Sequence, residues 1–144
     1  MSESARMKAM VFEKEIALFY LEEGVVPGNI LVQRLFLELA KQEIDHVLFI
    51  SEAMPAPGVP ALPSIEEGIR SFFKRLPEAQ VRTHATNVEA LRTARQMEKN
   101  GLAMYRRFAE EAQDPGEKAF FTSLLQQEAN HLESVDNVLR YLTG

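Results

Sequence analysis

Cysteine is absent from this sequence of 144 residues, and the sequence also lacks long apolar runs and concentrated basic segments. Without cysteine the chain can form no disulfide, iron–sulfur cluster, thiolate nucleophile or cysteine-ligated zinc site. Any metal ion must therefore be bound through oxygen and nitrogen atoms.

The other absences exclude further classes of protein. No stretch reaches the roughly 18 apolar residues of a membrane helix, and residues 1–6 lack the basic-then-apolar layout of a signal peptide. We therefore expect a cytoplasmic protein that does not bind membranes. The net charge is −5 and the basic residues are interleaved with acidic ones, so nucleic-acid binding is not expected. The length and composition predict one domain over residues 1–144.

Glycine and proline are confined to a few places, and they divide the chain into helical segments. The pattern predicts four long helices, over about residues 4–23, 30–54, 78–112 and 115–142. Gly24 suits the C-terminal end of the first helix, and Asn29 suits the N-cap of the second. Asp114, Pro115 and Glu117 together are typical of a helix start.

The connection between the second and third helices is unusual. Residues 55–63 contain four prolines, which excludes a helix there and predicts an extended crossover. Ser64 and Glu67 form a capping box for a short helix over about residues 65–76. We expect an all-α four-helix bundle of two helical hairpins. Because a long crossover allows protomers to exchange hairpins, we also expect a homodimer.

A set of polar residues recurs in the second half of the chain with an offset of 85 residues. Glu13, Tyr20, Glu43 and His46 correspond in this way to Glu98, Tyr105, Glu128 and His131. All eight occupy positions on the apolar stripes of the predicted helices, so each helix points one Glu toward the bundle axis. Four buried carboxylates without partners would be very costly, whereas two divalent cations would neutralise them.

The spacing within the repeat suits metal binding. Glu43 and His46 are three residues apart, so their side chains lie on one helix face and can bind one ion. Glu128 and His131 can bind a second ion in the same way. Each of these motifs follows another Glu by 30 residues, which an antiparallel hairpin brings level. Carboxylate and imidazole ligands suit iron or manganese, and zinc would also bind.

The two tyrosines lie two helical turns from a Glu on the same face. We expect the hydroxyls of Tyr20 and Tyr105 to donate hydrogen bonds to carboxylate ligands and to affect the reactivity of the centre, rather than to bind metal. His84 lies outside the repeat, and we expect it to be exposed and without function.

These paired Glu…Tyr and Glu-x-x-His hairpins resemble the rubrerythrin branch of the ferritin-like superfamily. The resemblance extends over all four predicted helices and includes Met97-Glu98-Lys99 and the segment from Gln127 to His131. It implies a ferritin-like bundle with two iron ions that are oxidised by hydrogen peroxide or dioxygen. The implied metal ligands are Glu13, Glu43, His46, Glu98, Glu128 and His131.

The sequence departs from the family pattern in two ways. Full-length rubrerythrins carry a Cys₄ rubredoxin domain, so we expect this chain to take electrons from an external donor such as a rubredoxin. The family's peroxidases also have a further Glu one turn from the Glu98 position, where this sequence has Arg95 and Gly101. Either Gly101 leaves room for a small oxidant beside the metals, or another helix packs closely against it.

Three functions are compatible with the sequence. The first is an oxidoreductase with a di-iron centre that reduces peroxide or dioxygen. The second is ferroxidation or storage of iron. The third is a non-catalytic helical bundle whose metal ions only neutralise the buried carboxylates.

Overall fold

The computed structural model describes residues 3–52 and 83–144. This part of the chain forms four α-helices and no strand: α1 (Glu3–Gly24), α2 (Ile30–Glu52), α4 (His84–Glu111) and α5 (Pro115–Thr143). The predicted all-α four-helix bundle is confirmed. The predicted crossover at 55–63 and short helix at 65–76 lie outside the described residues. None of the described helices has the length and apolar character needed to span a membrane.

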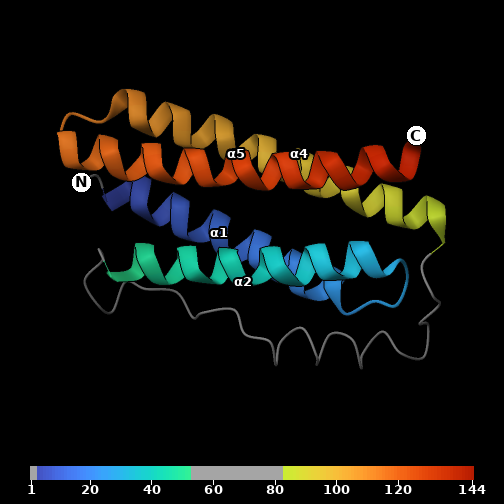
Figure 1. Cartoon of the computed structure of the whole chain (residues 1–144). Helices are drawn as coiled ribbons and strands as arrows, with labels where there is room; N and C mark the ends of the chain where they lie inside the picture. Colours follow the sequence, from blue (N-terminus) through green and yellow to red (C-terminus); the bar gives the residue numbers. More distant parts are fainter. Residues whose placement is uncertain (1–2, 53–82) are drawn as a thin grey trace.

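The helices form two antiparallel hairpins, α1 with α2 and α4 with α5 (Figure 1). Between the hairpins, α1 contacts α4 and α2 contacts α5. The α1–α2 turn lies at the end of the bundle where the chain terminates, and the start of α1 lies near the α4–α5 turn (Figure 1). The second hairpin thus repeats the first about an approximate twofold axis, so equivalent positions face each other across the bundle.

Two of the predicted helix starts are confirmed by their capping hydrogen bonds. The Asn29 side chain accepts hydrogen bonds from the backbone N–H groups of Leu31 and Val32, at 2.9 and 3.3 Å. The Asp114 side chain accepts one from the N–H group of Glu117, at 3.0 Å. These bonds satisfy donors that a helix leaves without partners in its first turn.

The predicted start of the third helix was wrong, whereas the predicted end of the first helix at Gly24 is confirmed. Helix α4 does not run continuously from near residue 78, because Thr83 has an extended backbone and its side chain caps the helix that begins at His84. Gly24 is the last residue of α1 and lacks the positive φ of a capping glycine. A Cβ atom at position 24 would lie 2.8 Å from Leu37 Cδ2, so this glycine allows α1 and α2 to approach closely.

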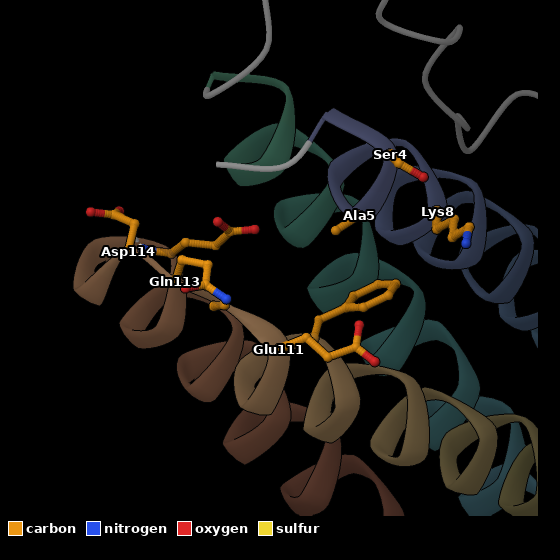
Figure 2. Close-up of a pocket in the computed structure, with 9 residues that line it drawn as sticks. Ser4, Ala5, Lys8, Glu111, Gln113 and Asp114 are labelled. Carbon is orange, nitrogen blue, oxygen red and sulfur yellow. Dashed lines mark hydrogen bonds between the residues drawn. The ribbon is translucent and has the colours of Figure 1, made fainter.

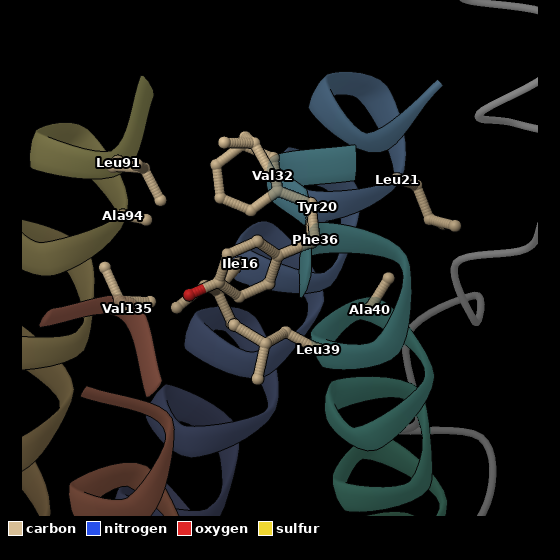
Figure 3. Packing of buried hydrophobic residues seen from close by; sticks show 10 residues of the cluster. All are labelled: Ile16, Tyr20, Leu21, Val32, Phe36, Leu39, Ala40, Leu91, Ala94 and Val135. Carbon is tan, nitrogen blue, oxygen red and sulfur yellow. The ribbon is translucent and has the colours of Figure 1, made fainter. Parts of the chain in front are cut away.

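The core consists of two apolar clusters with a polar layer between them. We call them the Phe36 cluster, drawn in Figure 3, and the Phe121 cluster. The first contains Ile16, Tyr20, Leu21, Val32, Phe36, Leu39, Ala40, Leu91, Ala94 and Val135. The second contains Ala9, Met10, Val47, Ile50, Tyr105, Phe108, Ala109, Phe121 and Leu124. On every helix the motif Glu lies, along the chain, between a residue of one cluster and a residue of the other.

Candidate metal centre

Each helix contributes one glutamate to the polar layer in the middle of the bundle. Glu13, Glu43, Glu98 and Glu128 have no exposed surface. The two histidines, His46 and His131, are only 5% and 3% exposed. The structure therefore brings together all six residues for which the sequence predicts a role in metal binding, whereas His84 is exposed on the surface.

The six side chains divide into two groups of four, and within each group the possible ligand atoms lie within 4.8 Å of one another. One group is Glu13, Glu43, His46 and Glu128, and the other is Glu43, Glu98, Glu128 and His131. Glu43 and Glu128 belong to both groups, and we call them the shared carboxylates. Glu13 and Glu98 each belong to one group, and we call them the terminal carboxylates. The arrangement is that of two adjacent cation sites.

Both imidazoles direct Nδ1 toward the carboxylates. The Nδ1 atom of His46 lies 3.1 Å from Glu128, 3.3 Å from Glu43 and 3.4 Å from Glu13. The Nδ1 atom of His131 lies 2.6 Å from Glu43, 3.6 Å from Glu128 and 3.7 Å from Glu98. The two rings are stacked, with their centroids 5.4 Å apart. Nδ1 is therefore the histidine atom that would bind a cation in either group.

Whether these residues fit metal ions can be judged from the carboxylate oxygens that lack a hydrogen-bond partner. One oxygen of each glutamate, Oε2 in all four, is buried and has no hydrogen-bond partner. A buried acceptor without a partner costs about 1–3 kcal/mol, and more when it is charged. Two cations between the four carboxylates would satisfy all of these atoms at once. The donors, oxygen with one imidazole nitrogen per group, fit iron or manganese.

Burial and the crowding of negative charge shift the pKa values of the side chains in the centre. Burial raises the pKa of Glu13, and burial together with the neighbouring Glu128 raises the pKa of Glu98 to about 8. Burial alone would lower the pKa of His131, but its hydrogen bonds to carboxylates outweigh burial and raise it to about 12. The pKa of His46 is raised for the same reason. Cations must displace these protons, so metal binding is coupled to proton release.

Each tyrosine donates a hydrogen bond to the terminal carboxylate of the opposite hairpin. The Tyr20 hydroxyl lies 2.6 Å from Glu98 Oε1, and the Tyr105 hydroxyl lies 2.7 Å from Glu13 Oε1. Tyr20 belongs to the Phe36 cluster, and its hydroxyl points out of that cluster toward the second hairpin (Figure 3). Burial and the adjacent carboxylate raise the pKa of both tyrosines, so both hydroxyls keep their protons.

Two glutamines for which the sequence predicted no role contact the histidines from the other side. Gln42 Oε1 lies 2.8 Å from His131 Nε2, and Gln127 Oε1 contacts His46 Nε2. Both glutamines immediately precede the Glu of their motif and are related by the same offset of 85 residues. The repeated unit is therefore Gln-Glu-x-x-His, and a longer comparison of the two halves would have identified it.

The space beside Gly101 is already filled. A Cβ atom at position 101 would lie 2.8 Å from Cε1 of Phe12 and closer still to its Cζ. The same ring packs edge-on against Tyr105, with centroids 5.9 Å apart. The prediction that Gly101 leaves room for an oxidant was therefore wrong, and the alternative, close packing of a neighbouring helix, is confirmed.

A separate hollow lies at the end of the bundle, between the start of α1 and the α4–α5 turn (Figure 2). It has a volume of about 510 Å³, and its lining includes Lys8, Phe108, Glu111 and Asp114. None of the six residues of the centre lines it.

The sequence matches a known protein family over most of its length. The model of the Rubrerythrin family matches residues 7–139, which include all six residues of the centre, both tyrosines and both glutamines. Searches of curated proteins and of solved structures found no match. The family match and the buried glutamate–histidine cluster together indicate a metal site compatible with two iron ions. The chain belongs to the rubrerythrin family.

Proposed function

We propose that the buried centre holds two iron ions and reduces hydrogen peroxide, or dioxygen, with electrons from an external donor. The observation that supports this most directly is the pair of four-residue groups that share Glu43 and Glu128. Carboxylates that belong to both groups would hold two cations next to each other, which would suit a reaction that needs two electrons.

When bound, a pair of ferrous ions supplies two electrons, which together with two protons convert one hydrogen peroxide into two waters. The side chains of the protein position the ligands for this reaction. The hydroxyls of Tyr20 and Tyr105 hold the terminal carboxylates in place and keep their protons within hydrogen-bonding distance of them. The Phe36 and Phe121 clusters lie on either side of the centre and exclude bulk water from it.

The electrons must come from outside these 144 residues. A rubredoxin-type site needs four cysteines, and these 144 residues contain none. We therefore propose that a donor such as a rubredoxin delivers the electrons.

The first test is the metal content of protein purified without a metal-affinity tag. We expect about two irons per chain, in line with the two groups of ligands. Under anaerobic conditions, one equivalent of hydrogen peroxide should oxidise both ferrous ions and produce a ferric absorption band in the near ultraviolet. Reduced rubredoxin should then restore the ferrous spectrum.

Other outcomes of the same experiment would favour the other functions. Uptake of many more than two irons per chain, with slow reaction toward peroxide, would favour ferroxidation or storage. Two zinc ions in a colourless protein that does not react with peroxide would favour a non-catalytic bundle.

A further inference from the structure

The two glutamines next to the centre form reciprocal links between the hairpins. Gln42 on α2 contacts His131 on α5, at 2.8 Å, and Gln127 on α5 contacts His46 on α2. In both cases the glutamine oxygen meets Nε2, while Nδ1 of the same ring faces the carboxylates. We propose that Gln42 and Gln127 are positioning residues that hold each imidazole as the Nε2–H tautomer, with Nδ1 free to bind a metal ion.

A second hydrogen bond supports the orientation of each amide. The Gln127 side-chain NH₂ donates to Ser123 Oγ at 3.3 Å, and the Gln42 NH₂ donates to Glu38 Oε1 at 3.5 Å. Both acceptors lie one helical turn before the glutamine. Because the NH₂ group is occupied along its own helix, the amide oxygen faces the ring. Only a protonated Nε2 can donate to that oxygen.

A preference for this tautomer matters because the other side of each ring favours the opposite one. Nδ1 of His131 lies 2.6 Å from Glu43, and Nδ1 of His46 lies 3.1 Å from Glu128. Both carboxylates attract a proton to Nδ1, which is the position that a metal ion needs without a proton. An acceptor at Nε2 keeps the remaining proton of the neutral ring on the far side, and so lowers the cost of freeing Nδ1.

This inference rests on the metal centre of the proposed function but not on its redox reaction. Zn²⁺ is therefore a suitable probe, since it binds the same donors and has no redox chemistry. Loss of peroxide reactivity with normal Zn²⁺ binding would leave the inference intact. Failure of the wild-type protein to bind Zn²⁺, Mn²⁺ or Fe²⁺ would remove the metal centre and the inference together.

The experiment compares leucine and glutamate at the two glutamine positions. Gln42→Leu and Gln127→Leu keep most of the side-chain volume but remove the acceptor, and each should weaken Zn²⁺ binding by about 10-fold to 100-fold. Gln42→Glu and Gln127→Glu keep the acceptor and should bind Zn²⁺ at least as tightly as the wild type. Affinity is measured by competition with a chelator of known strength.

Matched variants separate the hydrogen bond from charge and packing. Gln126 is exposed and immediately precedes Gln127, so Gln126→Leu and Gln126→Glu serve as controls for composition and charge. Both should leave Zn²⁺ affinity within about twofold of the wild type, because side chains one residue apart on a helix do not face the same site.

A spectroscopic readout tests the tautomer itself. In Zn²⁺-loaded protein with ¹⁵N-labelled histidine, each ring should show an Nε2–H proton that exchanges slowly with solvent, and each leucine variant should lose this protection at one ring only. Equal weakening of Zn²⁺ binding by leucine and glutamate would indicate a packing role and overturn the proposal. Unchanged affinity and exchange in both leucine variants would also overturn it. If a leucine variant fails to fold, a glutamate variant that binds Zn²⁺ 10-fold more weakly overturns it instead.

Discussion

The two halves of the metal centre have the same polar groups but different apolar neighbours. Each half has a terminal carboxylate, a histidine, a tyrosine from the opposite hairpin and a glutamine from the opposite hairpin. The packing around them does not repeat. Phe12 lies against Gly101, whereas the equivalent positions, 85 residues away in each case, hold Met97 and Ile16.

This difference separates two kinds of requirement. Metal binding depends on particular atoms at particular places, so the same residue types occur in both hairpins. Packing requires only that the available volume be filled, which a large and a small side chain can do as well as two of medium size. The residues that accept a hydrogen bond from the glutamine NH₂ groups also differ, since Glu38 in one half corresponds to Ser123 in the other.

Replacing a shared carboxylate should have the largest effect on the centre. Glu43→Ala or Glu128→Ala removes a ligand from both groups, so we expect nearly complete loss of bound metal. Glu13→Ala or Glu98→Ala affects one group and should leave about one metal ion per chain. Elemental analysis after gel filtration measures the difference.

Glu15 is exposed on α1 and provides the control, since Glu15→Ala should keep the wild-type metal content. Equal losses from Glu43→Ala and Glu13→Ala would show that the division into shared and terminal carboxylates has no chemical meaning. Full occupancy in Glu43→Ala would exclude Glu43 as a ligand.

Removal of metal should make stability strongly dependent on pH. Glu98 has its pKa raised from 4.5 to about 8, so above pH 4.5 the unfolded chain loses a proton that the folded chain keeps. His131, raised from 6.5 to about 12, acts in the same direction above pH 6.5. Rising pH therefore favours unfolding, and the metal-free protein should lose a few kcal/mol of stability between about pH 5 and pH 8.

Urea unfolding of chelator-treated protein across this range measures the effect. Glu98→Gln removes one of the titrating groups and should give a shallower dependence on pH. The metal-loaded protein should behave in the opposite way at the acid end, because protons compete with the cations for the same ligands. Equal stability of the metal-free protein at both pH values would contradict the clustering of these groups.

Much of the fold and of the metal centre could be predicted from the sequence, because the residues that determine them are close together in the chain or repeated. The caps at Asn29 and Asp114 depend on a few adjacent residues, and the metal-binding residues recur at a constant offset on the buried stripes. Which side chains pack against Gly24 and Gly101 could not be predicted. Both glycines lie against a side chain from another helix, Leu37 in one case and Phe12 in the other, and no pattern within the helix itself indicates that neighbour.

Adding a side chain at Gly101 should lower the stability of the protein by overpacking the half of the bundle that contains Phe12. Gly101→Ala places a methyl group against the Phe12 ring, and overpacking of this kind costs about 1–3 kcal/mol, partly offset by the higher helix propensity of alanine. Phe12→Leu in the same chain should recover most of the loss. Unfolding in urea measures the coupling between the two substitutions.

The equivalent pair in the other half provides the comparison. Ile16→Val removes one methylene from the Phe36 cluster and should cost about 0.5–1.5 kcal/mol. Because Met97 is flexible, its side chain should absorb part of this change. If Gly101→Ala is neutral both alone and with Phe12→Leu, the close contact in the structure does not limit packing.

The effect on metal content should be smallest for the tyrosine hydroxyls, whose removal instead tests whether the two halves react alike. Tyr20→Phe removes the hydrogen bond to Glu98, and Tyr105→Phe removes the one to Glu13. Neither hydroxyl belongs to the groups of ligands, so both variants should keep about two metals per chain. A hydrogen bond to a charged group contributes about 1.5–3 kcal/mol, so the rate of oxidation by peroxide should change by roughly 10-fold to 100-fold.

Stopped-flow measurement of ferrous oxidation in both variants makes the comparison direct. Tyr141 is largely exposed, and Tyr141→Phe should leave the rate unchanged. Equal effects of Tyr20→Phe and Tyr105→Phe would mean that the polar symmetry extends to the reaction. Unequal effects would place the asymmetry in the surroundings of the carboxylates, where Phe12 packs against Tyr105 and where Phe19 and Phe36 pack against Tyr20. Exchanging those aromatic neighbours, and not the ligands, would then be the way to make the two halves equivalent.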